Sequence, residues 1–110
     1  MNALRNKVQL IGNLGMNPQV KEFDGGKKLV KFSLATNESY KNNQGKCISE
    51  TQWHSMIAWG NTATYVEKFL KQGMQVAIDG KLINRIYTDK QGIKRFLTEI
   101  QINEVMIVND

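Results

Sequence analysis

The chain has 110 residues, of which 41% are hydrophobic and 23% charged, a composition that is ordinary for a soluble globular protein and excludes wholesale disorder. Its 15 Lys and Arg residues outnumber its 10 Asp and Glu residues, and the net charge of +5 suggests a polyanionic partner, although solubility alone would also explain it. No apolar run approaches the roughly 18 residues of a membrane span, the N-terminus lacks the apolar stretch of a signal peptide, and the single cysteine, Cys47, excludes an intrachain disulfide. We therefore expect a cytoplasmic protein with no membrane partner, folded as one domain over residues 1–110.

Alternating apolar and polar residues predict five strand regions along the chain. In chain order they cover residues 7–14, 20–36, 51–59, 75–87 and 94–108. Gly12 and Gly15 indicate a bulge or a close backbone approach near the end of the first region. The second region is predicted to be a hairpin with Asp24-Gly25-Gly26 between its arms, because Asp-Gly can supply the positive φ angles of a tight turn.

The segments between the strands predict one long loop and one helix. Residues 37–50 are polar and are expected to form the loop. Residues 62–72 are expected to form the helix, because Asn61 or Thr62 can cap its start and Gly73 can end it. Its apolar stripe is predicted to consist of Val66, Phe69 and Leu70. Five strands with one short helix between the third and the fourth predict an all-β protein, a five-stranded OB-fold barrel.

The two tryptophans, Trp53 and Trp59, share one face of the third predicted strand. Hydrophobicity alone would bury them. The other strands already supply ten core candidates, namely Val8, Leu10, Val30, Phe32, Leu34, Val76, Ile78, Leu82, Ile100 and Ile102. A five-stranded barrel is small inside, so this supply favours an outward orientation of both indoles without deciding it.

Two tyrosines lie next to basic residues. Tyr87 is expected on the outward face of its strand, with Lys81 and Arg85, where a ring can stack on a base and a cation can meet a phosphate. Covering the mouth of the barrel is an equally weighted alternative for Tyr87. Tyr40 precedes Lys41 in the polar loop, which again suits stacking, although a single exposed tyrosine that anchors a loop is common.

Several segments, in order from about residue 6 to residue 108, carry a resemblance to a known family. They are Asn6–Gly15 with Pro18 shortly after, Phe32–Tyr40, Thr51–His54, Trp59–Gly60, Phe69–Gly73, Gly80–Leu82 and Tyr87–Asp89. No segment is diagnostic alone, but together the chain resembles the bacterial single-stranded DNA-binding proteins (SSB). The resemblance implies an OB-fold protein, not an enzyme and without a cofactor, that protects single-stranded DNA in replication, recombination and repair near the nucleoid. It also implies a homotetramer, with a dimer as the alternative.

The resemblance assigns roles to individual residues of this chain. Four rings are expected to stack on bases: Tyr40, Trp53, Trp59 and Tyr87. The phosphates are expected to contact all or some of Arg5, Lys7, Lys28, Lys31, Lys41, Lys71, Lys81 and Arg85. His54 is interpreted as a subunit contact or a core histidine; a metal role is not expected, because the chain has no second histidine and Cys47 has no partner at metal-binding spacing.

Three alternatives remain open. A nuclease would need clustered carboxylates to hold metal, whereas the aspartates here are scattered. An OB-fold could instead bind RNA or a protein. A purely structural oligomer would use outward Ile11, Ile57 and Ile83 as subunit contacts and bury its tryptophans there. The 110 residues include neither the linker nor the acidic tail of typical relatives, which puts recruitment of other proteins through a tail in doubt, but not DNA binding.

Overall fold

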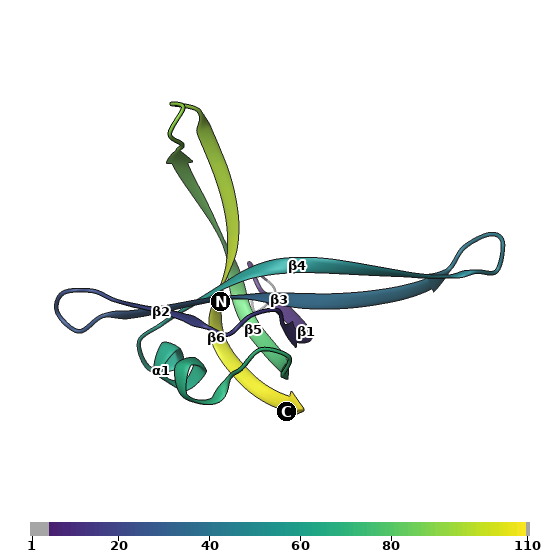
Figure 1. Cartoon of the computed structure of the whole chain (residues 1–110), viewed down its shortest axis with the longest axis horizontal. Coiled ribbons are helices and arrows are strands. Elements are labelled where there is room, and N and C mark those ends of the chain that lie inside the picture. Colours follow the sequence, from purple (N-terminus) through teal and green to yellow (C-terminus); the bar gives the residue numbers. More distant parts are fainter. Residues whose placement is uncertain (1–4, 110) are drawn as a thin grey trace.

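The computed structural model describes residues 5–109, which form a closed, strand-rich barrel with a single helix (Figure 1). The elements are β1 (Val8–Leu14), β2 (Gln19–Glu22), β3 (Lys28–Lys41), β4 (Cys47–Trp59), α1 (Gly60–Phe69), β5 (Gln75–Thr88) and β6 (Lys94–Asn109). The strand order is β1-β5-β6-β4-β3-β2, and β1 also pairs with β3. That extra pairing closes five strands into the predicted OB-fold barrel. No helix within residues 5–109 has the length and apolar character needed to cross a membrane.

The barrel closes where β1 meets β3, with Asn13 opposite Ala35. A Cβ atom built on Gly12 would collide with the carbonyl group of Ala35. The close backbone approach predicted at Gly12 is therefore confirmed, since only a residue without a side chain fits there. At Gly15 a Cβ atom would instead collide with the indole of Trp53.

The core forms inside the barrel from the inward side chains of β1, β3, β4, β5 and β6, together with one side of α1. Nine of the ten predicted core residues belong to it or pack against it. The exception is Leu82, which is 47% exposed. The pairing of β5 with β1 ends at Gly80, and beyond this residue β5 pairs with β6 alone, so Leu82 lacks the cover that β1 gives to the inward residues before it.

The helix differs from its prediction at both ends. It begins at Gly60, directly after β4, and its N-cap residue, Trp59, makes no side-chain capping hydrogen bond, so the predicted cap at Asn61 or Thr62 is wrong. It ends at Phe69, and Gly73, with φ 91°, lies in the following turn.

The predicted apolar stripe of the helix is only partly buried. Val66 and Leu70 enter the core, whereas Phe69 is 52% exposed and packs on Tyr65, with ring centroids 4.9 Å apart. Ala63, which the sequence analysis did not select, is fully buried. The helix therefore covers the barrel with a narrower face than its apolar composition predicts.

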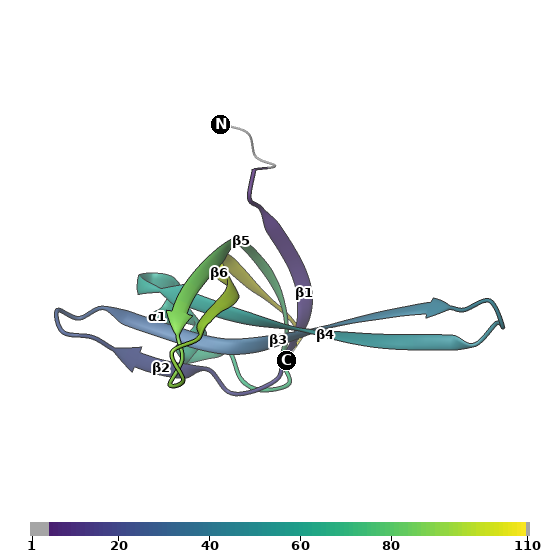
Figure 2. The same ribbon diagram turned by 90° about the horizontal axis from the view of Figure 1, so that it is seen from above.

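The predicted loop at 37–50 is wrong, because β3 and β4 remain paired across most of it, from Asn37 opposite Thr51 to Lys41 opposite Cys47. This stretch is a hairpin arm that projects far from the barrel (Figures 1 and 2). Both of its faces meet water, so it lacks the apolar alternation that marks a strand. Polar pairs link it instead, among them the Thr51 hydroxyl, which donates to the Asn37 side chain at 2.7 Å.

A second arm consists of the outer parts of β5 and β6 and the turn between them (Figure 1). Ile86 and Phe96 pair across it and are 66% and 76% exposed. Asp89 orders the turn: its carboxylate accepts the backbone N–H groups of Gln91 and Ile93, each at 2.9 Å, and the Arg95 Nε–H at 3.0 Å. One carboxylate thus fixes the end of the arm.

Replacing Gly12 with alanine is expected to lower the free energy of unfolding by about 1–3 kcal/mol, because the added methyl group cannot fit against the Ala35 carbonyl unless a strand moves. Urea denaturation at fixed protein concentration measures the change. Gln9→Ala, at an exposed position of the same strand, is the control and should change stability by less than about 0.5 kcal/mol. Equal stability of the two variants would contradict the close approach.

The Asp89 carboxyl is expected to titrate below its ordinary pKa of 3.8, first because it accepts the Ile93 amide and then because it accepts the Arg95 side chain. A lowered folded pKa means that this group stabilises the turn fully above the unfolded value and loses that effect as the pH falls through the folded pKa. NMR titration of the Asp89 carboxyl carbon measures the midpoint. A midpoint at or above 3.8 would show that the turn does not hold the charged form.

Candidate nucleic-acid interface

A row of paired residues crosses the outer surface of the barrel over four adjacent strands. Lys31 on β3 lies opposite Ile57 on β4, Ile57 lies beside Gln101 on β6, and Gln101 lies opposite Lys81 on β5. Neighbouring strands are about 4.8 Å apart, so the row is roughly 14 Å long. A lysine lies at each end of this row. We call the row, together with the outward residues beside it, the outer face.

Both tryptophans belong to the outer face. Trp53 and Trp59 lie on β4 at even spacing from Ile57, and their exposed fractions are 63% and 37%. The outward orientation that the small barrel interior favoured is therefore confirmed. Trp53 lies opposite Ala35 of β3, with its indole against Gly15, which directly follows β1, so two small residues leave room for the ring.

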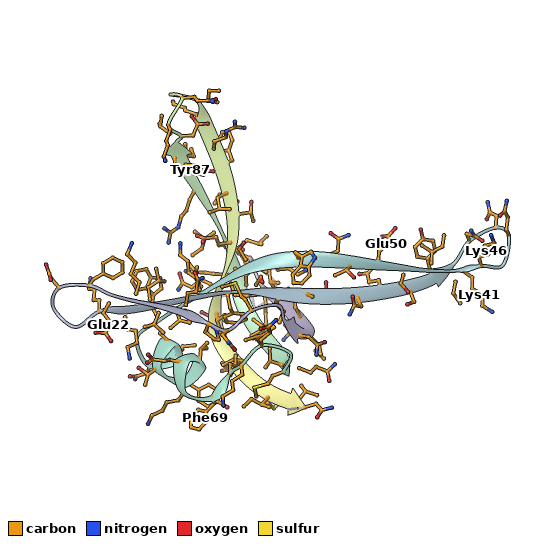
Figure 3. The ribbon with its side chains drawn as sticks, in the orientation of Figure 1. Glu22, Lys41, Lys46, Glu50, Phe69 and Tyr87 are labelled. Atoms are coloured by element: carbon orange, nitrogen blue, oxygen red, sulfur yellow. The ribbon has the colours of Figure 1, made fainter. Side chains whose placement is uncertain are left out.

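The two tyrosines lie on the arms rather than on the barrel. Tyr40 is 49% exposed on the β3–β4 arm, and Tyr87 is 50% exposed near the end of the β5–β6 arm, where Figure 3 labels it. Tyr40 belongs to a strand, not to a mobile loop, and its hydroxyl donates to Glu50 at 3.2 Å. Tyr40 is five residues beyond Ala35, which pairs with Trp53. Because side chains alternate between the two faces of a strand, the rings of Tyr40 and Trp53 project from opposite faces of the hairpin. The four rings are thus distributed over the barrel and two arms.

A buried acid, Glu99 on β6, anchors two of the predicted phosphate contacts. Its carboxylate is 3% exposed, with Oε1 at 2.8 Å from Arg85 Nε and Oε2 at 3.9 Å from Lys31 Nζ. The Arg85 contact is ionic rather than an aligned hydrogen bond, since Oε1 has no hydrogen-bond partner. A buried charge is tolerated only when it is paired. Both cations remain nearly half exposed, so Glu99 holds them at the surface.

Two other predicted phosphate contacts are neutralised locally. Lys28 lies 2.6 Å from Glu67 and 3.9 Å from Glu22, and the hydrogen bond to Glu67 is the main cause that raises the pKa of Lys28. Lys7 lies 3.2 Å from Asp79. These pairs leave less free charge for a phosphate than the sequence count suggests.

The remaining predicted cations occupy separate parts of the molecule. Arg5 precedes β1, Lys71 follows α1, and Lys41 lies at the tip of the β3–β4 arm, where Figure 3 labels it. Of the eight predicted phosphate contacts, the structure therefore brings Lys31, Lys81 and Arg85 together with the tryptophans.

His54 lies on the opposite side of β4 from the tryptophans and is half-buried. Its Nε2 atom is 3.0 Å from the Thr36 hydroxyl, so the imidazole has a partner within the chain. Residues 5–109 contain no group of three or more His, Cys, Asp or Glu side chains placed to hold a metal ion. Ile57 is fully buried under its neighbours on the outer face, so the alternative that used it as an exposed subunit contact is wrong for this residue.

The similarity of this chain to known proteins agrees with a nucleic-acid interface. A model of the single-strand binding protein family matches residues 5–108. Single-stranded DNA-binding protein 1 of Chlorobaculum tepidum is 40% identical over 104 residues, which are 94% of this chain and 64% of that protein. Single-stranded DNA-binding protein 1 of Xylella fastidiosa is 39% identical over 107 residues, 96% of this chain and 79% of that protein. This chain thus spans under two thirds of the first relative's length and about four fifths of the second's.

A solved structure described as the Plasmodium falciparum SSB complex with ssDNA is also similar. It superposes with a TM-score of 0.86 at 33% sequence identity, over 99% of this chain and 100% of that one. The family model and both relatives cover nearly all of the barrel and both arms. The chain belongs to the single-strand binding protein family.

Proposed function

We propose that this chain binds single-stranded DNA without sequence preference and protects it in replication, recombination and repair. The observation that carries the proposal is the outer face, where Trp53 and Trp59 are exposed between cations. The similar solved structure is described as a complex with single-stranded DNA, which supports the same ligand for this fold. Family membership supports a binding protein rather than an enzyme.

Stacking supplies the first part of the mechanism. Every base has an aromatic face, and a base stacked on a side-chain ring contributes roughly 1–3 kcal/mol whatever its identity. The strand crosses Trp53 and Trp59 on the barrel and continues to Tyr40 and Tyr87 on the arms. Duplex DNA hides its base faces in its own stack, so it binds poorly to this surface.

Charge supplies the second part. Lys31, Lys81 and Arg85 meet the phosphates on the outer face, and Lys41 meets them at the end of its arm. Each neutralised phosphate adds about −0.7 to the slope of log affinity against log salt. The other expected contacts act more weakly or at the edges of the path; they are Arg5, Lys7, Lys28 and Lys71.

Assembly into a homotetramer, or a dimer, is part of the proposal. A second row on the barrel surface joins Ile11 on β1, Ala77 on β5 and Met106 on β6, with Ile11 60% and Met106 64% exposed. Exposed apolar side chains in one patch mark a protein interface, and a second copy of the chain would cover it symmetrically. His54 is proposed as a contact between subunits.

The proposal places residues 1–110 in one OB-fold domain that needs no cofactor. It acts in the cytoplasm, on single strands exposed near the nucleoid.

Trp53→Ala is expected to weaken binding of oligo-dT by about 1–3 kcal/mol and to leave the salt dependence nearly unchanged, because it removes a stacking ring and no charge. Fluorescence titration at several salt concentrations measures both quantities. Tyr65→Ala, which removes a half-exposed ring from α1, is the control and should bind like the parent. Full affinity in a folded Trp53→Ala variant would remove this ring from the path. Duplex DNA should compete poorly, and competition between oligo-dT and oligo-U decides between DNA and the alternative of RNA.

Lys81→Gln is expected to make the salt slope shallower by about 0.7, the contribution of one phosphate contact. Binding of oligo-dT between low and moderate salt measures the slope. Lys68→Gln removes an exposed lysine from the last turn of α1, away from the outer face, and should leave the slope at its parent value. If both variants give the same slope, Lys81 does not contact phosphate.

A further inference from the structure

Phe23, in the turn between β2 and β3, packs against Trp59 at the end of β4. Their ring centroids are 6.0 Å apart and their planes differ by 28°. Phe23 is 40% exposed and contributes nothing to the barrel core. Phe23 thus extends the exposed aromatic surface of Trp59 at the end of the outer face.

The turn fixes the backbone of Phe23, and the contact with Trp59 places its ring. The Phe23 N–H donates to the Lys27 carbonyl at 2.8 Å, and the Gly26 N–H donates to the Phe23 carbonyl at 3.2 Å. Gly25 and Gly26 carry the positive φ angles, 88° and 84°, so the angle predicted for Asp24 of the Asp-Gly pair lies one residue later. A ring held by such a turn can bind a flat ligand with little further loss of entropy.

An open pocket of about 1000 Å³ lies at the paired rings. Phe23 and Trp59 form its aromatic part, and its polar lining comes from Lys27 and Lys28 of the turn and β3 and from Asn61 and Thr64 of α1. The Thr64 hydroxyl donates to the backbone within α1, whereas the Asn61 amide is exposed and offers both donors and an acceptor. The pocket thus combines stacking area, a cation and an amide, which match a base and its phosphate.

The charges around the pocket also favour a nucleotide. Lys21 Nζ lies 5.4 Å from the centre of the Phe23 ring, and Lys27 is exposed in the turn. Lys28 is largely neutralised by Glu67, as described above, so it adds little. The cations beside the rings therefore suit one phosphate group, with stacking as the larger contribution.

We propose that Phe23 and Trp59 together hold a base of the bound strand, so that Phe23 is a fifth stacking ring and the β2–β3 turn is part of the DNA path. The inference rests on the proposed function and extends it, since neither strand parity nor the family resemblance selected Phe23. Trp53 and Trp59 are six residues apart on one face of β4, about 20 Å of strand. A polynucleotide that passes from Trp53 to Trp59 arrives directly at this pocket.

The chain offers a selective reporter for the pocket, because it has two tryptophans. In a Trp53→Phe background the emission comes from Trp59 alone, and oligo-dT is expected to quench it. Adding Phe23→Ala to this background should weaken binding about tenfold relative to Trp53→Phe and reduce the quench at saturation, with the salt slope unchanged. Phe23→Leu, which keeps apolar bulk but removes the ring, should lose affinity similarly; parent-like binding by it would show that Phe23 only packs the turn.

Phe69→Ala is the matched control, since it removes a ring of similar exposure from α1 and should bind like its parent. Circular dichroism and thermal melting establish that each variant is folded. If Phe23→Ala and Phe69→Ala give the same affinity and the same quench, Phe23 does not stack on a base. The converse background, Trp59→Phe, reports on Trp53. If oligo-dT quenches Trp53 but Phe23→Ala changes neither affinity nor quench, this inference alone is wrong. If oligo-dT quenches neither tryptophan, the proposed function itself is wrong.

Discussion

The limited space inside a five-stranded barrel is the constraint on which the rest of this structure depends. At Gly12 and at Gly80 a single added carbon would meet the backbone of a neighbouring strand, so the wall itself is tightly closed. The interior is filled by aliphatic side chains, one phenylalanine and one methionine. Indole rings therefore lie outside, where an exposed aromatic face is costly unless a ligand covers it. The same packing that closes the barrel thus produces a surface suited to stacking.

A second consequence concerns charge, because the outer face also contains a buried carboxylate. Glu99 restrains Arg85 and Lys31, which lowers the entropy that the proposed contact with a phosphate would cost. The same carboxylate competes with the phosphate for both cations. Arg85 and Lys31 are therefore better positioned than free surface cations, but each gains less from meeting DNA than an unpaired lysine such as Lys81 would.

Sequence alternation predicted the parts of the strands that line the barrel, because one of their faces is buried and the other is not. It failed where the strands leave the barrel. The polar arm at 37–50 resembled a loop, and Leu82 resembled core because its parity continued past Gly80. Phe23 was predicted to end the first arm of a hairpin and was assigned no role there, whereas the strand ends at Glu22 and Phe23 packs against Trp59. The burial of Glu99 was not predicted, because a charged residue in a strand is ordinarily exposed. Only the register of β6 against β5 brings Arg85 next to its carboxylate.

The ion pairs also change the balance between the two parts of the proposed mechanism. Lys7, Lys28 and Arg95 each lie within 4 Å of a carboxylate on or near the barrel and arms, in addition to the two cations held by Glu99. Each ion pair removes a positive charge together with a negative one, so the formal excess of +5 stays with cations outside these pairs, among them Lys21, Lys27, Lys41 and Lys81. A long-range attraction of that size is screened beyond about 8 Å at physiological salt. The proposed binding then depends on direct contacts, in which cations meet phosphates and rings meet bases at the surface itself.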